Sequence, residues 1–428
     1  MVLVKVLHGR GELEFSIPRR NLVGVFASSI NRIAVPGDGE AVVRSALASP
    51  IGGVGLSELA AKARKIVLIA SDHTRPVPSK QIVPAMLEEI RRGNPEAEIT
   101  ILIATGMHRG TTRGELIEKF GEEIVSREKI VVHDARDEGS MAYLGILPSG
   151  GELWINKLAV EADLLVSEGF IEPHFFAGFS GGRKSVLPGI AGYRTVLANH
   201  CGEFIRSASS RTGVLEGNPI HKDMVWAAGA AKLAFVVNVV INSSKRVMGA
   251  FAGEPFETHA RGCEYLKKLC RVQVPISDIV ITSNGGYPLD QNVYQAVKGM
   301  TAAEACVRDG GVIVMSAECE QGHGGESFFK LLSECKSHQE LYRRLGAVPQ
   351  AETEADQWEA QILARILSRN RVIMVGPKCD GGMLEAMGLM HVATAEEAMR
   401  TAFSLVGEDG RVAVLPDGVS LIVEGVSR

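Results

Sequence analysis

The sequence has no uninterrupted apolar run long enough to cross a bilayer, and its N-terminal segment lacks the basic head and apolar core of a signal peptide. It also has no long basic block, because 46 Lys and Arg residues stand against 50 Asp and Glu residues, for a net charge of −4. We therefore expect a cytoplasmic protein with neither a membrane nor a nucleic acid as its partner. Any positive field must be local.

Cysteine is scarce, and the seven cysteines include no C-x-x-C pair. This scatter argues for reduced thiols in the cytoplasm and against a disulfide framework. It also excludes a cage of thiolates around a metal ion, because such a cage needs closely spaced cysteines. A bound metal would need soft ligands that the protein does not supply.

Apolar residues are plentiful and make up 46% of the 428 residues, enough for two or three domains with substantial cores. Strand-like and helix-like runs alternate from Lys65 onward and again from Asp278, a pattern typical of parallel α/β layers. We predict an α/β protein of two domains with mainly parallel sheets and an active-site cleft between them. The predicted domains are an N-terminal catalytic and cofactor-binding domain, residues 1–272, and a C-terminal α/β domain, residues 273–407. The tail, residues 408–428, is expected to pack back onto the first domain.

Three local segments carry clear patterns. Residues 152–161 are predicted to be helical, and the run 233–253 to form two strands joined at Asn242 to Ser244. Residues 258–270 are predicted to form the helix that ends the first domain. The domain boundary is therefore expected near residues 271–277.

A glycine-rich turn, residues 178–185, follows a short apolar strand and a loop that holds His174, and we expect a helix to begin at its end. Such a turn lets backbone N–H groups approach an anion and leaves the positive end of a helix facing it. Ser180, Gly181 and Gly182 are therefore candidate contacts for the phosphate of a nucleotide.

The turn partly fits the phosphate loop G-x-x-x-x-G-K-[ST] of nucleotide hydrolases, but Arg183 occupies the position of its second glycine. His174 before the turn and His200 after it also have no task in a hydrolase that needs mainly Mg²⁺ and positioning. A phosphate-loop nucleotide enzyme and a non-catalytic nucleotide-binding module stay open as alternatives.

Polar side chains gather where the predicted strands end, which is the edge at which open α/β sheets bind ligands. These residues are Asp72, Arg75, His108, His174, Tyr294, Gln295 and Lys298. The last three share one helix face, because they lie three and four positions apart. Since the set comes from both halves of the chain, two domains are expected to face one cleft.

Arg75 and two histidines have the chemistry of a site for a hydroxy acid. Arg75 lies in a stiff turn before Pro76, and a planar guanidinium can hold a carboxylate through two parallel hydrogen bonds. A structural ion pair with Asp72 is the alternative for this arginine. His108 and His174 come from different loops and could approach a substrate from opposite sides as general bases, although a lone loop histidine is usually a hydrogen-bonded surface residue.

Three motifs closely resemble the nickel-dependent lactate racemases, and the resemblance runs nearly the whole length of the chain. The motifs are SDHTRPVPSK at 71–80, TGMHRGTTRGE at 105–115 and PHFFAGFSGGRKSVLPG at 173–189. The resemblance implies an isomerase, a racemase or epimerase of D- and L-2-hydroxy acids. Lactate is the first choice of substrate, and malate, longer aliphatic acids and sugar acids are the alternatives.

The resemblance also implies a cofactor. In this family nickel is held by pyridinium-3-thioamide-5-thiocarboxylic acid mononucleotide, a nickel-pincer nucleotide, which matures with the help of other proteins. The matching positions are Lys184 for the covalent link and His200 for the metal, with Asp72 as a further cofactor contact. The cofactor accepts a hydride from the substrate Cα and leaves a 2-keto acid intermediate.

Substrate roles follow from the same resemblance. His108 and His174 match the acid/base positions, and Arg75 and Lys298 match ligands of the substrate carboxylate. Tyr294 and Gln295 are expected to line the site. For Trp358, closing the pocket and plain packing are both open.

Overall fold

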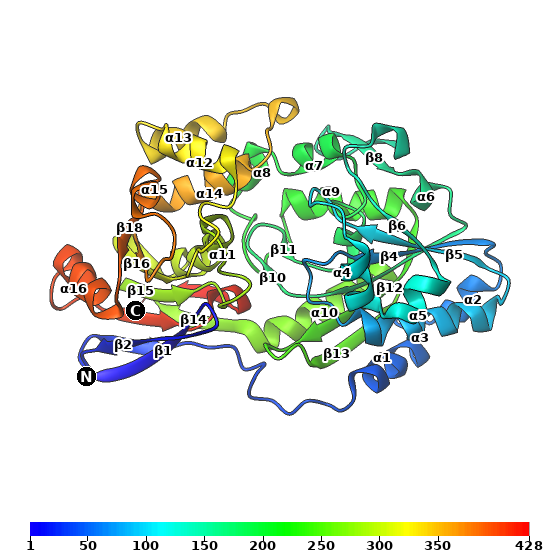
Figure 1. The fold of residues 1–428 in the computed structure, drawn as a ribbon, viewed down its shortest axis with the longest axis horizontal. Helices are drawn as coiled ribbons and strands as arrows, with labels where there is room; N and C mark the ends of the chain where they lie inside the picture. The colour runs from blue at the N-terminus through cyan, green and yellow to red at the C-terminus, as the bar shows by residue number, and fades with distance from the viewer. Residues whose placement is uncertain (428) are drawn as a thin grey trace.

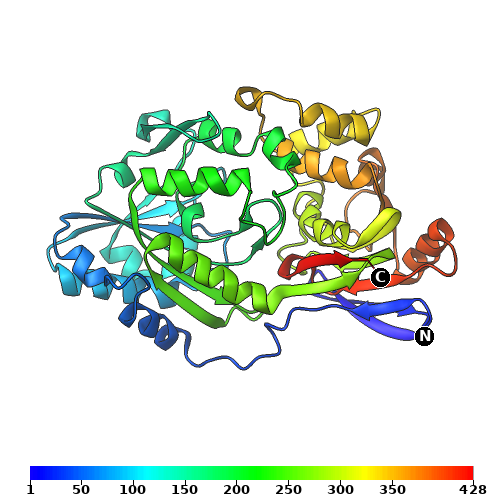
Figure 2. The same ribbon diagram turned by 180° about the vertical axis from the view of Figure 1, so that it is seen from behind.

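The chain folds into two α/β units, each built on a six-stranded sheet (Figures 1 and 2). The computed structural model describes residues 1–427. The strand orders are β13-β12-β9-β4-β5-β6 in the first sheet and β18-β17-β16-β15-β19-β3 in the second. Neighbouring strands are parallel except for the β12–β13 pair. The predicted α/β class with mainly parallel sheets is therefore confirmed.

Helices cover both faces of the first sheet. Residues of β4 alternate between two cores: Ile66 lies in the core that contains Met86, and Val67 lies in the core that contains Met224. The strands of this sheet are β4 (Lys65–Ser71), β5 (Glu98–Ala104), β6 (Lys129–Val132), β9 (Leu164–Phe170), β12 (Leu233–Ile241) and β13 (Val247–Gly253). The helices of this unit are α1 (Gly39–Ala48), α2 (Leu56–Ala60), α3 (Ser79–Gly93), α4 (Arg113–Phe120), α5 (Glu122–Arg127), α6 (Lys157–Val160), α7 (Tyr193–Asn199), α8 (Gly202–Arg206), α9 (Pro219–Ala230) and α10 (Pro255–Cys270).

The second sheet is also covered on both faces, by α11 and α14 on one side and by α16 on the other. Its strands are β3 (Leu22–Val25), β15 (Ser277–Ser283), β16 (Val307–Ser316), β17 (Arg371–Val375), β18 (Met390–Val392) and β19 (Val412–Leu415). Its helices are α11 (Val293–Glu304), α12 (Glu326–Ser333), α13 (His338–Leu345), α14 (Gln357–Leu367), α15 (Gly381–Ala386) and α16 (Ala395–Val406). No helix within residues 1–427 is long and apolar enough to cross a membrane.

The N-terminal strands lie with the second unit, contrary to the prediction that residues 1–272 form the first domain. The hairpin of β1 (Val2–His8) and β2 (Gly11–Ile17) packs against α16, and β3 pairs with β19. Phe15 and Ile17 are fully buried in the core under that hairpin. Pairing between strands so far apart in the chain leaves no local signal in the sequence, which is why the prediction was wrong for these residues.

The C-terminal tail is shared between the two units rather than packed wholly onto the first. Strand β19 lies inside the second sheet, and β20 (Ile422–Val426) pairs with β14 (Arg271–Pro275), the segment that joins the units. Ile422 alone of this strand is buried in the core of the first unit, against Gly213. The domain boundary expected near residues 271–277 remains a prediction.

Two of the local predictions are confirmed and two are wrong. Strands β12 and β13 form the expected hairpin, and α10 covers the expected helix. Residues 152–161 are mostly a strand, β8 (Glu152–Asn156), because they pair with β7 (Met141–Ile146) before the one-turn α6. The glycine-rich turn ends in a single 3₁₀ turn, η2 (Gly182–Ser185), so no helix begins there.

Candidate active site

Asp72 and His108 form a pair at the ends of β4 and β5. The Nδ1 of His108 lies 2.7 Å from Oδ2 of the buried Asp72, and Thr74 donates its hydroxyl to the other carboxylate oxygen over 2.8 Å. Burial alone would raise the pKa of Asp72, but the hydrogen bond and charge of His108 outweigh it and lower that pKa. A carboxylate on Nδ1 places the proton of the neutral ring there and leaves Nε2 free as a base. The contact of Asp72 with a cofactor remains a prediction.

Hydrogen bonds fix the backbone of Arg75 and leave its guanidinium available to a ligand. Its N–H donates to the carbonyl of Asp72 over 3.3 Å, and the amine of Lys119 donates to its carbonyl over 3.1 Å. Within residues 1–427, no carboxylate lies within 4.0 Å of the guanidinium. The alternative of a direct ion pair with Asp72 is therefore not supported, and a half-buried fork is available for a substrate carboxylate.

His174 lies on a short two-stranded ladder between the units, formed by β10 (Pro173–His174) and β11 (Gly178–Phe179) (Figure 1). Its ring stacks on Phe175 at 5.1 Å and meets Phe176 edge-on at 4.6 Å. Ala177 donates its N–H to Nδ1 over 3.3 Å, so Nε2 is the nitrogen left for a ligand. Burial lowers the pKa of His174 well below its usual value, and Lys184, Lys298 and other nearby cations lower it further.

The cations around His174 come from both units. The amine of Lys184 lies 5.9 Å from the ring of Phe176, and the amine of Lys298 lies 5.9 Å from the ring of Phe175. Burial lowers the pKa of Lys184 well below its usual value, and the charges of Arg183 and Arg75 lower it further. An amine with a lowered pKa is a better nucleophile near neutral pH than an ordinary lysine amine.

The glycine turn is shaped by packing within the protein. Gly181 has a φ of 78°, and a Cβ there would lie 2.8 Å from the carbonyl oxygen of Phe170. The N–H of Gly182 donates to Asn238 over 2.8 Å, and the hydroxyl of Ser180 donates to Phe170 over 3.1 Å. These groups are therefore already hydrogen-bonded, and the expectation of a helix end facing an anion is wrong. Cofactor contacts of Ser180, Gly181 and Gly182 remain a prediction.

His200 ends α7 and is 6% exposed. Its Nδ1 lies 3.0 Å from the carbonyl oxygen of Val196, an acceptor that requires the proton on Nδ1 and leaves Nε2 bare. Burial and the charge of Lys184 lower the pKa of His200 to about 3, so the ring is neutral. Phe176 and Trp358 enclose the ring edge-on at 5.1 and 5.2 Å. A neutral imidazole held by a carbonyl is a competent metal ligand.

The second unit contributes residues of helix α11 to the site. The amine of Lys298 donates to Gln295 over 2.6 Å, as the spacing of three predicts, and Asn292 caps the helix by accepting the N–H of Gln295. Burial, followed by the charge of Arg75, lowers the pKa of Lys298. The indole N–H of Trp358 donates to the hydroxyl of Tyr294 over 3.1 Å. Trp358 therefore packs between Tyr294 and His200, and its role in closing the pocket remains a prediction.

Tyr294→Phe is expected to destabilise the apo protein by about 1–3 kcal/mol, because the indole N–H of buried Trp358 loses its acceptor. Urea unfolding followed by fluorescence measures the change. Tyr143→Phe is the matched control, since that side chain is 49% exposed and should change stability by less than about 0.5 kcal/mol. An equal effect of both variants would show that the hydroxyl of Tyr294 carries no stability.

Two carboxylic acids of the site escaped prediction. Burial raises the pKa of Glu172, against the charges of Arg75, Lys298 and Lys184. Glu359 is 1% exposed, and burial raises its pKa to about 8 against the charge of Lys298. Glu172 could have been found, because it lies two residues before His174. Glu359 could not, because α14 is buried along almost its whole length, and only the packing of this helix against α11 brings the carboxyl group near Lys298.

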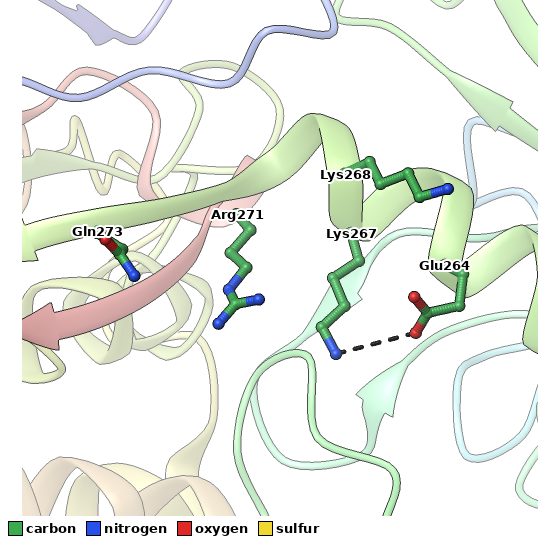
Figure 3. A pocket seen from close by; sticks show the side chains of 5 residues that line it. All are labelled: Glu264, Lys267, Lys268, Arg271 and Gln273. Atoms are coloured by element: carbon green, nitrogen blue, oxygen red, sulfur yellow. Dashed lines mark ion pairs between the residues drawn. The ribbon is translucent and has the colours of Figure 1, made fainter.

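The open pocket in Figure 3 is a separate feature at the surface, where α10 meets β14. It is lined by Glu264, Lys267, Lys268, Arg271 and Gln273. The amine of Lys267 lies 3.9 Å from Glu264, and most of these side chains are exposed. None of them belongs to the site described above.

The site thus combines two imidazoles from separate segments, two cations from opposite units and, beside a neutral imidazole, a lysine amine whose pKa is lowered. It defines a two-unit α/β enzyme for a small anionic substrate. The chain belongs to the lactate racemase family and is an isomerase: residues 8–213 match the lactate racemase N-terminal domain, and residues 272–423 match the lactate racemase C-terminal domain. This confirms the family resemblance.

Relatives match along the full chain. A lactate racemase of Thermoanaerobacterium thermosaccharolyticum is 52% identical over 99% of both chains, and one of Lactiplantibacillus plantarum is 48% identical over 99% of this chain and 100% of its own. The structure is similar to that of the lactate racemase apoprotein from T. thermosaccharolyticum, with a TM-score of 0.95, 51% identity and coverage of 99% of this chain and 100% of that one. A Thermotoga maritima protein with 20% identity and a TM-score of 0.67 over 91% of this chain and 100% of its own shares the fold.

Proposed function

We propose that this protein interconverts D- and L-lactate with the help of a nickel-pincer nucleotide. The proposal is supported by Arg75 and Lys298, whose charges act on His174, by His108 beside Asp72, and by relatives that are lactate racemases. Its cofactor would be nickel with pyridinium-3-thioamide-5-thiocarboxylic acid mononucleotide, linked to Lys184. Cofactor-maturation proteins and a cytoplasmic location are part of the proposal.

The side chains present fit this cofactor. Within residues 1–427, no group of three or more His, Cys, Asp and Glu side chains could hold a metal ion, so the protein offers His200 and the nucleotide would supply the other donors. The bare Nε2 of His200 suits a borderline metal such as nickel. The neutral amine of Lys184 suits a covalent link. When bound, the cofactor supplies an acceptor for a hydride from the substrate Cα.

The substrate carboxylate would be bound by Arg75 and Lys298, one from each unit. This pair fixes the 2-hydroxy acid while its hydroxyl faces an imidazole. With the cofactor bound as hydride acceptor, one imidazole would accept the proton of the substrate hydroxyl. The second imidazole would donate a proton to the same oxygen when the other face of the substrate carbon is used, so that the centre is inverted. Hydride loss avoids a carbanion beside the ionised carboxylate, which would place two negative charges together.

Racemisation assays on protein produced with the maturation proteins test the proposal. D- and L-lactate should each give the racemic mixture, and intact mass under mild denaturation should show a covalent adduct. Malate, longer aliphatic hydroxy acids and sugar acids test the alternative substrates. Faster turnover of one of these would replace lactate, and an adduct-free protein that still racemises would end the cofactor assignment.

His200→Ala is expected to lose bound nickel while the fold is retained, because within residues 1–427 no cluster of three or more candidate ligands could hold the metal without this imidazole. Metal content per protein, measured by mass spectrometry, should fall at least about tenfold. His133→Ala is a suitable control, since that buried histidine is bonded to Ala191 and Asn156 away from the site. Unchanged nickel in His200→Ala would rule out this residue as the ligand.

A further inference from the structure

Arg183 lies in the glycine turn and is only 2% exposed. Its side chain is the largest of the fully buried side chains within residues 1–427. Its guanidinium is enclosed by the turn itself and by α9 and α10. It donates to the carbonyl oxygens of Ala177, Phe179, Ser180 and Gly181 and to Nδ1 of His221, all within 3.5 Å. Its Nη1 also lies 3.0 Å from Nε2 of His259, a nitrogen that is itself 2.9 Å from the carbonyl oxygen of Ser180. Each of the three guanidinium nitrogens therefore has an acceptor.

Every one of these acceptors is neutral. Within residues 1–427, no carboxylate lies within 4.0 Å of Arg183. Burial lowers the pKa of His221 to about 4, and it lowers that of His259 well below its usual value; in both rings the charge of Arg183 adds to the effect. Burial lowers the pKa of Arg183 itself only to about 10, so it stays charged near neutral pH. A buried cation without an anion is costly and rare unless it has a task.

The polarity of the turn is the reverse of a phosphate loop. A phosphate loop points backbone N–H groups inward at an anion, whereas this turn points the carbonyls of residues 177–181 inward at a cation. Arg183 takes the position of a glycine in the phosphate-loop pattern. Its side chain is the cation that these carbonyls face. The next residue along the chain is Lys184.

We propose that Arg183 is a positioning residue for Lys184. Its fork binds the carbonyls of residues 177–181 and so fixes the turn that presents the amine, and its unpaired charge, one residue away in the chain, disfavours a second positive charge there. The inference rests on the proposed attachment of the cofactor to Lys184. It assigns a role to the arginine that separates this turn from a phosphate loop.

Other charges also face the Lys184 amine. Arg75 and Lys298 act in the same direction as Arg183, Glu172 opposes them, and burial contributes most. Arg183 is the cation that contributes most, and it is bonded to the same turn. Changing the charge beside Arg183 should therefore alter the reactivity of the amine without touching the substrate-binding cations.

A pair of variants at His221 tests the charge while keeping the fork. Its Nδ1 accepts from Nε of Arg183 over 3.0 Å, and the side-chain oxygen of an Asn or Asp can take the place of that nitrogen. His221→Asn keeps a neutral acceptor, whereas His221→Asp introduces a side chain of the same size and shape that carries a negative charge. The side chain is only half-buried, so both variants should fold.

The readout is competitive acetylation of the apo protein with acetic anhydride between pH 6 and 10, with Lys184 compared by mass spectrometry to the exposed Lys62. His221→Asp should raise the pH midpoint of Lys184 acetylation by about one unit, which is a tenfold lower rate below the midpoint. His221→Asn should match the parent. Equal midpoints in the two variants would overturn the role of the charge.

Two variants of Arg183 separate charge from shape. Arg183→Lys keeps a cation and should retain the midpoint, while Arg183→Gln should raise it by about one unit or more. Arg365→Gln is the control for lost stability, because Arg365 is a 5% exposed arginine paired with Glu304 far from the turn. If Arg183→Gln lowers the melting temperature like the control but leaves the midpoint unchanged, the residue is structural only. Because acetylation needs no cofactor, this outcome is independent of whether the cofactor proposal holds.

Discussion

Lys184→Arg is expected to give a folded protein that carries no covalent cofactor and has no racemase activity, even when the maturation proteins are present. A guanidinium is neither deprotonated nor a usable nucleophile, whereas burial lowers the pKa of the lysine amine and so favours its nucleophilic form. The measurement is intact mass under mild denaturation, and the adduct mass should be absent.

Lys184→Ala should give the same result, since it removes the amine altogether. The matched control is Lys267→Arg, a change from lysine to arginine in the surface pocket of Figure 3, which should keep both adduct and activity. If Lys184→Arg racemises at the parental rate, Lys184 acts only as a cation for the cofactor phosphate. The covalent link would then have to be abandoned.

Replacing either His108 or His174 is expected to abolish nearly all turnover in both directions. The two rings lie on separate loops, after β5 and after β9, and each is proposed to serve one face of the substrate. A complete cycle needs both, because reversibility forbids a steady conversion that uses one base in one direction only. General acid–base help is worth about 10²–10⁴-fold, and steady-state rates should fall by that factor.

The half-reactions of the two variants should differ. With excess holoenzyme in a single turnover, His108→Ala should reduce the cofactor with one enantiomer of lactate and His174→Ala with the other. The change in cofactor absorbance on rapid mixing reports this step. His391→Ala, a change at an exposed histidine paired with Glu385, should leave both half-reactions intact. If both site variants respond equally to both enantiomers, the histidines position the substrate and are not face-specific bases.

Local patterns predicted most of the fold. The apolar runs that became β4, β5, β9 and β15 are buried strands whose ends face one another across the two units, because parallel strands covered by helices must be apolar throughout. The failures are those where a partner distant in sequence decides. Residues 152–156 form a strand because β7 pairs with them, β3 joins the second sheet because it pairs with β19, and the β1–β2 hairpin lies with the second unit because it packs against α16.

The site was predictable as an inventory of residues. Motif and strand-end position indicated His108, His174 and Arg75 without any structure, since ligands bind where parallel strands end. The pairing of Asp72 with His108 was not predictable, because only the fold brings Nδ1 of His108 to 2.7 Å from the Asp72 carboxylate. Glu359 was equally hidden, because its place beside Lys298 depends on the packing of α14 against α11.

The sequence by itself determined the class of fold, the family and the side chains available for chemistry, because these follow from local periodicity and from motifs within a few dozen residues. Only the tertiary structure decided which protonation states those side chains hold. The lowered pKa values of His200, Lys184 and His174 follow from burial and from cations that lie elsewhere in the chain. Electrostatic free energy depends on distance in space and on exclusion of water, and neither can be read from order along the chain.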